Sequence, residues 1–216
     1  MARAVLFDLD GTLVDSAPDI HAGVSVVLRE EGVEPLPFEI VRGFIGNGVP
    51  MLMTRVMAAV GMGEDARLHR DLCARFIRWY EDAPAGLTKP YAGVEAALRG
   101  LGVPMGLCTN KPEGPTRALL AQMGWAGFFP VIVGGDTLAL RKPDPAPLRL
   151  AIRELAQPAL FVGDSEVDAE TADRAGVTFL LFTGGYRKAP VEALPHRAAF
   201  DHWAEFPGLL AEVARG

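Results

Sequence analysis

The chain of 216 residues is half hydrophobic, which suits one substantial core, or a core domain with a smaller inserted domain, and argues against disorder. A formal net charge of -6 without any Lys/Arg block argues against a nucleic-acid partner. No apolar run approaches the roughly 20 residues that cross a bilayer, so we expect a cytoplasmic protein with no leader and no membrane partner. The two cysteines, Cys73 and Cys108, are expected to be reduced, buried thiols.

Apolar residues follow two different periodicities along the chain. A buried strand is predicted at residues 4–7, and a block with helical spacing and no strand follows it. The helices expected in this block are 20–30, 39–44, 51–60 and 67–80. Strand-like runs then return, separated by helical patterns such as 94–101 and 116–123. These runs are 105–108, 131–133, 160–162 and 178–182. Such alternation predicts a parallel sheet.

Turn-forming residues mark where the chain enters and leaves the helical block. The first group lies near residues 15–18, and the second, at residues 83–90, is rich in Pro, Ala and Gly. We therefore predict an α/β fold with a Rossmann-like parallel-sheet core and an inserted α-helical cap domain that determines substrate specificity. The core would comprise residues 1–15 and 87–216, and the cap residues 16–86.

Two carboxylates, Asp8 and Asp10, come directly after the first strand, where Gly11 permits a tight turn. Open α/β sheets bind their ligands at this edge, beyond the carboxyl ends of the strands. Because both acids reach the same edge, they could share a divalent cation while only one of them faces the substrate. The longer string from Asp8 to Ser16, DLDGTLVDS, is far more specific than a DxD pair alone.

Three later strand ends also carry polar groups that would converge on the same crevice. Thr109 and Asn110 offer a hydroxyl and backbone N–H groups for phosphoryl oxygens, although an ordinary helix cap explains them equally well. Lys142 stands just before a proline-stiffened helix start, where it could neutralise a phosphate. Asp164 and Asp168 follow a further buried strand.

Four acids around one crevice would repel one another, and like charges resist ionisation unless a cation compensates them. Mg²⁺ suits oxygen ligands, whereas the four histidines lack the spacing of a zinc site and are interpreted as structural or exposed. A Ser–His–Asp hydrolase is not favoured, because the sequence has no GxSxG elbow. The sequence therefore predicts Mg²⁺ as the cofactor.

The order DxDGT, Thr-Asn, Lys-Pro and GDSxxD resembles the haloacid dehalogenase superfamily, specifically its phosphatases with a helical cap inserted after the first motif. The resemblance implies that Asp8 is the nucleophile that forms an aspartyl-phosphate and that Asp10 is the general acid and base. This division is physically reasonable, because a metal-bound carboxylate is a poor base but a well-aimed nucleophile. Asp10 also favours phosphate chemistry, since true dehalogenases lack the second acid.

The same resemblance implies a phosphoryl site and a metal site. Thr109 with the Asn110 amide would bind phosphoryl oxygens, and Lys142 would neutralise the charge that spreads over them. Asp168 would orient the metal waters or Lys142 from behind the metal ligands. The implied ligands of Mg²⁺ are the carboxylate of Asp8, the backbone carbonyl of Asp10, and Asp164.

The predicted cap contains a glycine-flanked asparagine, Gly46-Asn47-Gly48, between two helices. This segment, with residues 89–94 and 134–147, is similar to bacterial phosphoglycolate phosphatases, which implies conversion of 2-phosphoglycolate to glycolate and phosphate. Free N–H groups at Gly46 to Gly48 could meet the substrate carboxylate, although a plain helix–helix turn is an equal alternative. Arg42 could add positive charge nearby.

The same residues leave several alternatives open. The core would also suit another small substrate, such as a sugar phosphate or pyrophosphate, or a β-phosphoglucomutase, although the cap shows no set of sugar-hydroxyl readers. A non-catalytic phospho-acceptor module also combines an Asp at a strand end with Mg²⁺, Thr and Lys, but Asp10 and the inserted cap count against it. The expected partner is a small phosphorylated metabolite, and both a monomer and a homodimer are compatible with the sequence.

Overall fold

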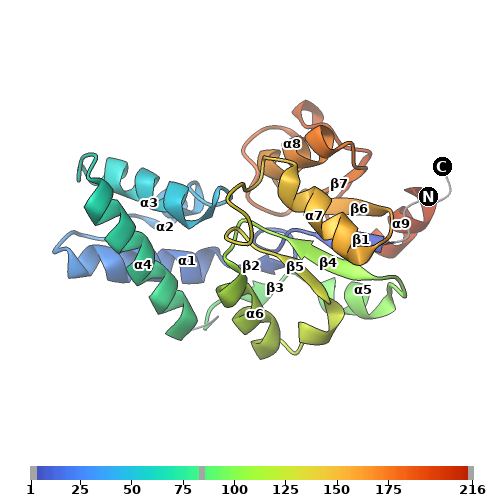
Figure 1. The fold of residues 1–216 in the computed structure, drawn as a ribbon, viewed down its shortest axis with the longest axis horizontal. Helices are drawn as coiled ribbons and strands as arrows, with labels where there is room; N and C mark the ends of the chain where they lie inside the picture. Colours follow the sequence, from blue (N-terminus) through green and yellow to red (C-terminus); the bar gives the residue numbers. More distant parts are fainter. Residues whose placement is uncertain (1–3, 83–85, 214–216) are drawn as a thin grey trace.

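The computed structural model describes residues 4–82 and 86–213 and contains a parallel sheet with helices on both faces (Figure 1). Six strands lie in the order β5-β4-β1-β6-β7-β8, and neighbours pair in parallel. Their bounds are β1 Ala4–Phe7, β4 Met105–Cys108, β5 Val131–Val133, β6 Ala159–Gly163, β7 Phe179–Phe182 and β8 Ala198–Phe200. The predicted α/β fold class is thereby confirmed.

Helices cover both faces of the sheet, which explains why its strands are continuous apolar runs. In β1, Val5 and Phe7 pack into one hydrophobic cluster and Leu6 into the opposite one. The helices on the side of Phe7 are α5 Val94–Gly100, α6 Glu113–Gln122 and α9 Phe206–Val213. Those on the side of Leu6 are α7 Ala146–Leu155 and α8 Glu166–Ala175 (Figure 1). Short 3-10 turns, η1 Ala126–Phe128 and η2 Val191–Ala193, complete the connections.

The chain between β1 and β4 builds a group of helices to one side of the sheet, here called the helical unit (Figure 1). It consists of α1 Ala17–Glu30, α2 Phe38–Arg42, α3 Gly48–Ala59 and α4 Ala66–Asp82. Their apolar faces meet in a hydrophobic cluster of their own, in which Leu28, Met53 and Leu72 are fully buried. The helical unit therefore has a core separate from that of the sheet.

Two short strands mark the places where the chain enters and leaves the helical unit. β2 Val14–Asp15 pairs antiparallel with β3 Lys89–Pro90, so the two crossings lie side by side. The sequence predicts turns here, and a two-residue strand is too short to produce a periodic signal. The predicted second hinge includes residues 83–85, which lie outside the described residues, as do residues 1–3 and 214–216 of the predicted core. The domain boundaries stay a prediction.

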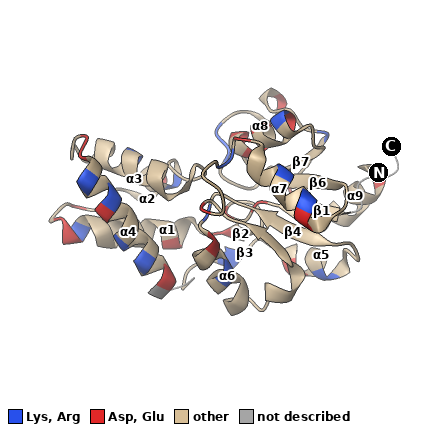
Figure 2. Ribbon diagram, viewed as in Figure 1, with Lys and Arg blue, Asp and Glu red and all other residues tan. Residues whose placement is uncertain are grey.

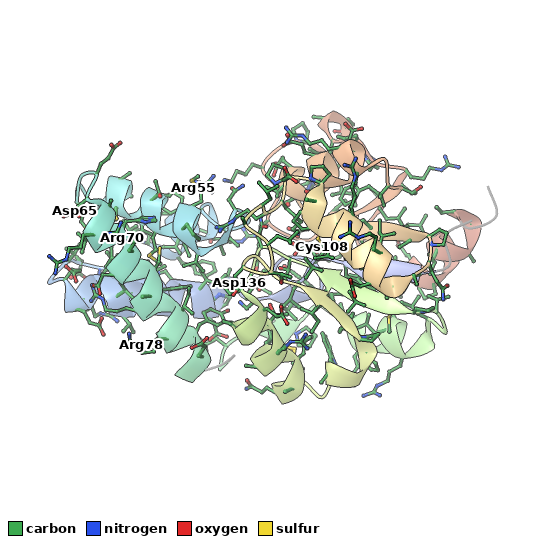
Figure 3. The ribbon with its side chains drawn as sticks, in the orientation of Figure 1. Arg55, Asp65, Arg70, Arg78, Cys108 and Asp136 are labelled. Carbon is green, nitrogen blue, oxygen red and sulfur yellow. The ribbon has the colours of Figure 1, made fainter. Side chains whose placement is uncertain are left out.

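Charged residues of both signs are interspersed along the helices (Figure 2). None of the described helices is long and apolar enough to cross a membrane. Both cysteines are free thiols, as expected from the sequence. Cys108 lies inside the fold on β4, where burial raises the pKa of its thiol to about 12 (Figure 3). Such a thiol stays protonated at neutral pH and is unreactive.

Candidate active site

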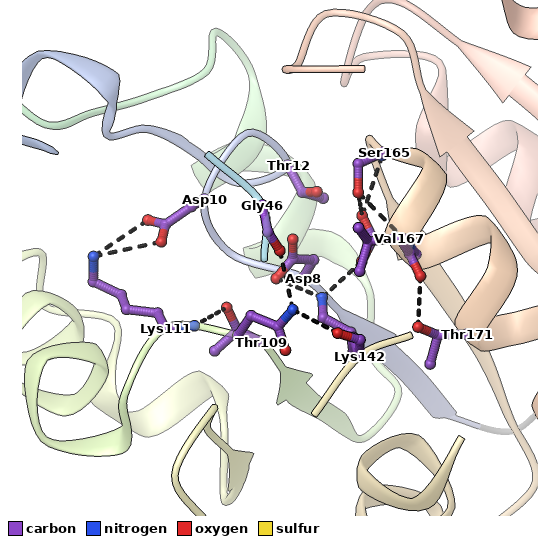
Figure 4. A network of polar contacts seen from close by, with 12 residues as sticks. Asp8, Asp10, Thr12, Gly46, Thr109, Lys111, Lys142, Ser165, Val167 and Thr171 are labelled. Atoms are coloured by element: carbon purple, nitrogen blue, oxygen red, sulfur yellow. Dashed lines mark hydrogen bonds and ion pairs between the residues drawn. The ribbon is translucent and has the colours of Figure 1, made fainter. Parts of the chain in front are cut away.

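The carboxyl ends of three adjacent strands bring the predicted site residues together (Figure 4). Asp8 follows β1, Thr109 and Asn110 follow β4, and Asp164 follows β6. Because these strands are parallel and neighbours in the sheet, their ends open at the same edge. Lys142 comes from the loop between β5 and α7, and it reaches the same place from the side.

A buried lysine holds two of the acids together. The ammonium of Lys142 donates a hydrogen bond of 2.6 Å to Asp168 Oδ1 and lies 2.9 Å from Asp8 Oδ1. The Lys142 side chain is only 2% exposed. Burial opposes its charge, but Asp168 and Asp8 outweigh that effect and raise the pKa of Lys142 above its usual value. The lysine is therefore a permanent positive charge at the base of the site.

The surroundings of Asp8, the nucleophile predicted from the sequence, raise its pKa above the usual value of an aspartate. Burial raises the pKa of Asp8 to about 6, Lys142 works in the opposite direction, and the charges of Asp168 and Asp10 raise it further. Asp8 Oδ1 is buried and has no hydrogen-bond partner among the described residues, although the Lys142 ammonium lies 2.9 Å from it. One lysine thus leaves the negative charge at this site incompletely compensated.

Asp164 is held by groups from both ends of the chain. Its Oδ1 accepts a hydrogen bond of 2.8 Å from the Thr12 hydroxyl, and its Oδ2 accepts one of 2.6 Å from the Tyr186 N–H. A methyl group at Gly185 would lie 2.3 Å from Asp164 Oδ2, and one at Gly11 would lie 2.5 Å from it. Burial, followed by the charges of Asp168 and Asp8, raises the pKa of Asp164 well above its usual value.

Asp168 lies in the first turn of helix α8 and is fully buried. It forms a capping box with Ser165: the Ser165 Oγ and N–H donate to Asp168 Oδ2 at 2.6 and 3.1 Å. Its other oxygen accepts from Lys142. These bonds fix Asp168 behind Asp8 and Asp164, which agrees with a supporting role for Asp168.

Among the described residues, Asp8, Asp164 and Asp168 are the acids that could hold a metal ion, with one oxygen of each within 4.8 Å of the others. Three hard carboxylate oxygens and an excess of negative charge fit a small divalent cation. The carboxylate of Asp10 is not in this group and lies instead 3.4 and 3.5 Å from the ammonium of Lys111. A contribution of Asp10 through its backbone carbonyl stays a prediction.

The turn after β4 supplies polar groups next to Asp8. The Asn110 side chain donates from Nδ2 to the carbonyls of Gly46 at 3.0 Å and Lys142 at 2.9 Å, so it joins the helical unit to the Lys142 loop. These two bonds use both N–H groups of the side-chain amide. Because the Thr109 N–H donates to the Val133 carbonyl and the Lys111 N–H to Thr109 Oγ1, the Thr109 hydroxyl and the Asn110 backbone N–H are the donors left for a ligand. Gly135 presses against this turn, because a methyl group there would lie 2.2 Å from the Asn110 carbonyl.

The segment Gly46-Asn47-Gly48 faces the site from the helical unit. Gly46 and Gly48 line a cavity together with Asp8 and Asp10, and Gly48 begins helix α3. The side chain of Asn47 is used inside the helical unit, where its Oδ1 accepts 2.9 Å from Arg55 of α3 (Figure 3). The predicted substrate-binding role of this segment therefore falls to its backbone rather than to the Asn47 side chain.

Arg42, another candidate of the sequence analysis, contacts the loop after β7. Its guanidinium lies 5.6 Å from the ring centre of Tyr186 and 3.4 Å from the Gly185 carbonyl. The hydroxyl of Tyr186 in turn donates to Asp15 at 2.7 Å and accepts from the backbone N–H of Ser16 and Ala17. Arg42 thus lies beside the crossing between sheet and helical unit.

Sequence reasoning did not assign roles to several residues that complete the site. These are Thr12, Lys111, Ser165 and Tyr186. Thr12 and Ser165 belong to the motifs that flank the acids, and Lys111 directly follows Asn110, so each was within reach of a closer look at the strand ends. Tyr186 binds Asp164 through its backbone N–H, and such a contact cannot be predicted from the residue type.

Comparisons with known proteins agree with this geometry. A family model described as "Haloacid dehalogenase-like hydrolase" matches residues 5–182. A phosphoglycolate phosphatase of Cereibacter sphaeroides is 54% identical over 97% of this chain and 98% of its own, and one of Rhodobacter capsulatus is 43% identical over 97% of each. A crystal structure titled as a predicted phosphoglycolate phosphatase from Haemophilus somnus superposes with a TM-score of 0.90, at 26% identity, over 97% of this chain and 98% of that one. The resemblance inferred from the motifs is thus confirmed, and the chain belongs to the haloacid dehalogenase-like hydrolase family.

Proposed function

We propose that this protein is a Mg²⁺-dependent phosphatase that converts 2-phosphoglycolate to glycolate and phosphate through a covalent phosphate on Asp8. The observation that carries the proposal is the position of Asp8: a buried carboxylate at a strand end, beside Lys142 and two further acids, that opens into a cavity with Thr109. The substrate itself is taken from the relatives named phosphoglycolate phosphatase.

Asp8 and Asp10 divide the chemistry between them. A carboxylate oxygen of Asp8 attacks phosphorus, the bond from phosphorus to the ester oxygen breaks, and Asp10 gives its proton to the leaving alkoxide. Asp10 then takes a proton from a water that attacks the aspartyl-phosphate, which releases inorganic phosphate and restores Asp8. The 3.4 Å contact with Lys111 directs the Asp10 carboxylate toward the cavity rather than into the acid cluster.

Positive charge at the site comes from two sources. Lys142 supports the transferred phosphoryl group through its contact with Asp8, and Thr109 with the Asn110 backbone amide binds phosphoryl oxygens. Mg²⁺, held by Asp8, Asp164 and the Asp10 carbonyl, would supply further positive charge. This charge would reduce the repulsion between the phosphate dianion and the Asp8 carboxylate. Asp168 positions Lys142 through their 2.6 Å hydrogen bond.

The helical unit serves as the cap of this site, with residues 16–86 as its proposed extent. Its separate hydrophobic cluster supports movement as one body, and the cavity between it and the sheet supports a role in excluding water from the first step. Gly46 and Gly48 line this cavity, and the backbone N–H groups of Gly46 to Gly48 would bind the part of the substrate beyond the phosphate. The cytoplasmic location expected from the sequence belongs to the same proposal.

The lining of the cavity argues against a sugar phosphate or a mutase. Among the described residues that line it from the helical unit, most are apolar: Ile20, Ile45, Val49, Leu52, Phe76 and Ile77. Such walls offer few partners for the hydroxyls of a sugar, and an unpaired buried hydroxyl is costly. The two-carbon substrate 2-phosphoglycolate has no sugar hydroxyls and needs no partners for them.

The test is phosphate release with and without Mg²⁺, measured as kcat/KM on 2-phosphoglycolate, sugar phosphates, pyrophosphate and p-nitrophenyl phosphate. We expect a preference for phosphoglycolate of at least about tenfold, or roughly 1.4 kcal/mol of transition-state binding. Asp8→Asn should abolish turnover and protein-bound phosphate, while Asp201→Asn, at an exposed acid, should change neither. Turnover by Asp8→Asn would contradict the nucleophile assignment, and activity on the other esters alone would discard the substrate but keep the phosphatase.

A further inference from the structure

We propose that Lys111 is a specificity-determining residue whose ammonium binds the second anionic group of the substrate, its carboxylate. The proposal rests on the proposed function and extends it, because it names the group of this chain that separates 2-phosphoglycolate from an uncharged ester of the same length. Its contact with Asp10 gives Lys111 a positioning role, and the proposal adds a direct contact with the substrate.

Lys111 lies in the wall of the cavity next to Asp8, where a residue that binds the substrate carboxylate must lie. It follows the Thr109-Asn110 turn after β4, its side chain is 5% exposed, and it lines the cavity together with Asp8 and Asp10 (Figure 4). Of the described residues that line this cavity, Lys111 is the only one with a positive charge. An anionic group that extends from a phosphate bound at Asp8 into the cavity therefore has one cationic partner within the lining.

The contacts of Lys111 leave it able to bind a ligand. Its ammonium lies 3.4 and 3.5 Å from the two oxygens of Asp10, longer than the usual 2.7–2.9 Å of a charge-assisted hydrogen bond. Lys142, by contrast, lies at 2.6 and 2.9 Å from its two acids. The acids thus hold Lys142 at short distances, whereas the longer contacts of Lys111 with Asp10 leave its ammonium able to donate to a ligand as well.

An aromatic ring of the helical unit sets the direction of the Lys111 ammonium. The ring centre of Tyr80, at the end of α4, lies 3.7 Å from Lys111 Nζ, which is the geometry of a cation–π contact. This contact orients the charge without using a hydrogen-bond acceptor. It also joins the charge to the helical unit, so that the lysine and the cavity wall are aligned only when the two parts of the protein are together.

The apolar walls of the cavity increase the selectivity expected from one charge. A carboxylate that leaves water for a cavity of Ile, Leu, Val and Phe side chains pays a large desolvation cost unless it meets an opposite charge. Lys111 provides that charge, and its attraction is stronger there than at an exposed site. A neutral end group needs no such partner, so loss of Lys111 should harm only the anionic substrate.

The competing interpretation is that Lys111 merely positions Asp10, the proposed general acid and base. The two roles differ in their dependence on the substrate. A positioning role affects proton transfer to every leaving alcohol, whereas a recognition role affects only an ester that carries a carboxylate. Two esters with the same carbon frame, 2-phosphoglycolate and ethyl phosphate, therefore separate the roles.

The experiment compares kcat/KM of the Mg²⁺-loaded wild type, Lys111→Met and Lys111→Arg on these two esters, with melting temperatures as a check of folding. Lys89→Met is the matched control, because it removes the same charge from an exposed position on β3 that lines neither the cavity nor the acid cluster. We expect Lys111→Met to lose at least about tenfold on 2-phosphoglycolate and less than about threefold on ethyl phosphate, in line with a hydrogen bond to a charged group. Lys111→Arg should keep most of the preference, and Lys89→Met all of it.

Equal losses of Lys111→Met on the two esters would overturn the recognition role and leave Lys111 as a positioning residue. A wild type that hydrolyses ethyl phosphate but not 2-phosphoglycolate would instead overturn the proposed function, and this inference with it. If Lys111→Met does not fold, Lys111→Gln serves the same comparison, since it removes the charge and retains a polar end group on a shorter side chain.

Discussion

The raised pKa of Asp8 makes the metal-free protein more stable at low pH. A carboxylate whose pKa is lowered by folding has the opposite effect. Burial raises this pKa to about 6 in the folded protein, from 3.8 in the unfolded chain. The folded state therefore binds more protons than the unfolded state between these two values. It follows that the Asp8 contribution stabilises the protein at low pH and is lost as the pH rises through about 6.

The magnitude follows from the two pKa values. Between pH 7 and pH 5, protonation of Asp8 should raise the free energy of unfolding by about 1 kcal/mol. Asp164, whose pKa is also raised, adds in the same direction. With saturating Mg²⁺ the difference should disappear, because a carboxylate that holds the metal stays ionised in both states at these pH values.

The assay is urea unfolding at pH 5 and pH 7, in EDTA and in saturating Mg²⁺, for the wild type and for Asp8→Asn. Other groups of the protein also titrate in this range, and the variant serves to subtract their contribution. We expect the wild type minus the variant to gain stability at pH 5 in EDTA and to show no gain in Mg²⁺. If the two proteins show the same pH dependence in EDTA, the reasoning about a buried, half-compensated Asp8 is refuted.

Three further predictions concern the residues around this acid. Asp10→Asn should slow hydrolysis of the aspartyl-phosphate more than its formation, so that rapid-quench labelling detects accumulated phospho-enzyme; a rate loss with no accumulation would contradict its role as base. Gly185→Ala places a methyl group 2.3 Å from Asp164 Oδ2, and we expect weaker Mg²⁺ binding by calorimetry, with unchanged affinity as the contrary result. Tyr186→Phe removes a 2.7 Å bond to Asp15 and should lower the free energy of unfolding by about 1–3 kcal/mol, which urea titration would measure; no loss would mean that the hydroxyl is dispensable.

The sequence predicted the elements that are long or strongly apolar. The strands that form the centre of the sheet were found within a residue or so, because each is buried on both faces and reads as a short apolar run. The pairing of β2 with β3 was not predicted, since it depends on residues about 75 apart along the chain that have no common pattern. Strand β8 and helix α9 were likewise not predicted.

The same distinction applies to the site. Asp8, Asp164 and Lys142 could be found from the sequence, because each directly follows a strand or precedes a helix and the topology brings those ends together. Lys111 could be located at a strand end from the sequence, but its contact with Tyr80, on a different part of the fold, could not be predicted. Contacts between the sheet and the helical unit leave no signal in local spacing or composition.

The antiparallel pairing of β2 with β3 has a consequence for how the chain folds. Strand β1 must find β4, with which it pairs from Val5↔Met105 onward, across the whole length of the helical unit. Once the helical unit has folded and its two ends are joined by β2 and β3, the flexible chain that remains between β1 and β4 is about a quarter as long as in the unfolded protein. Loop closure then costs about 1 kcal/mol less. A chain with an insertion of this kind can therefore assemble its sheet at nearly the rate of one without it, provided that the inserted helices fold first.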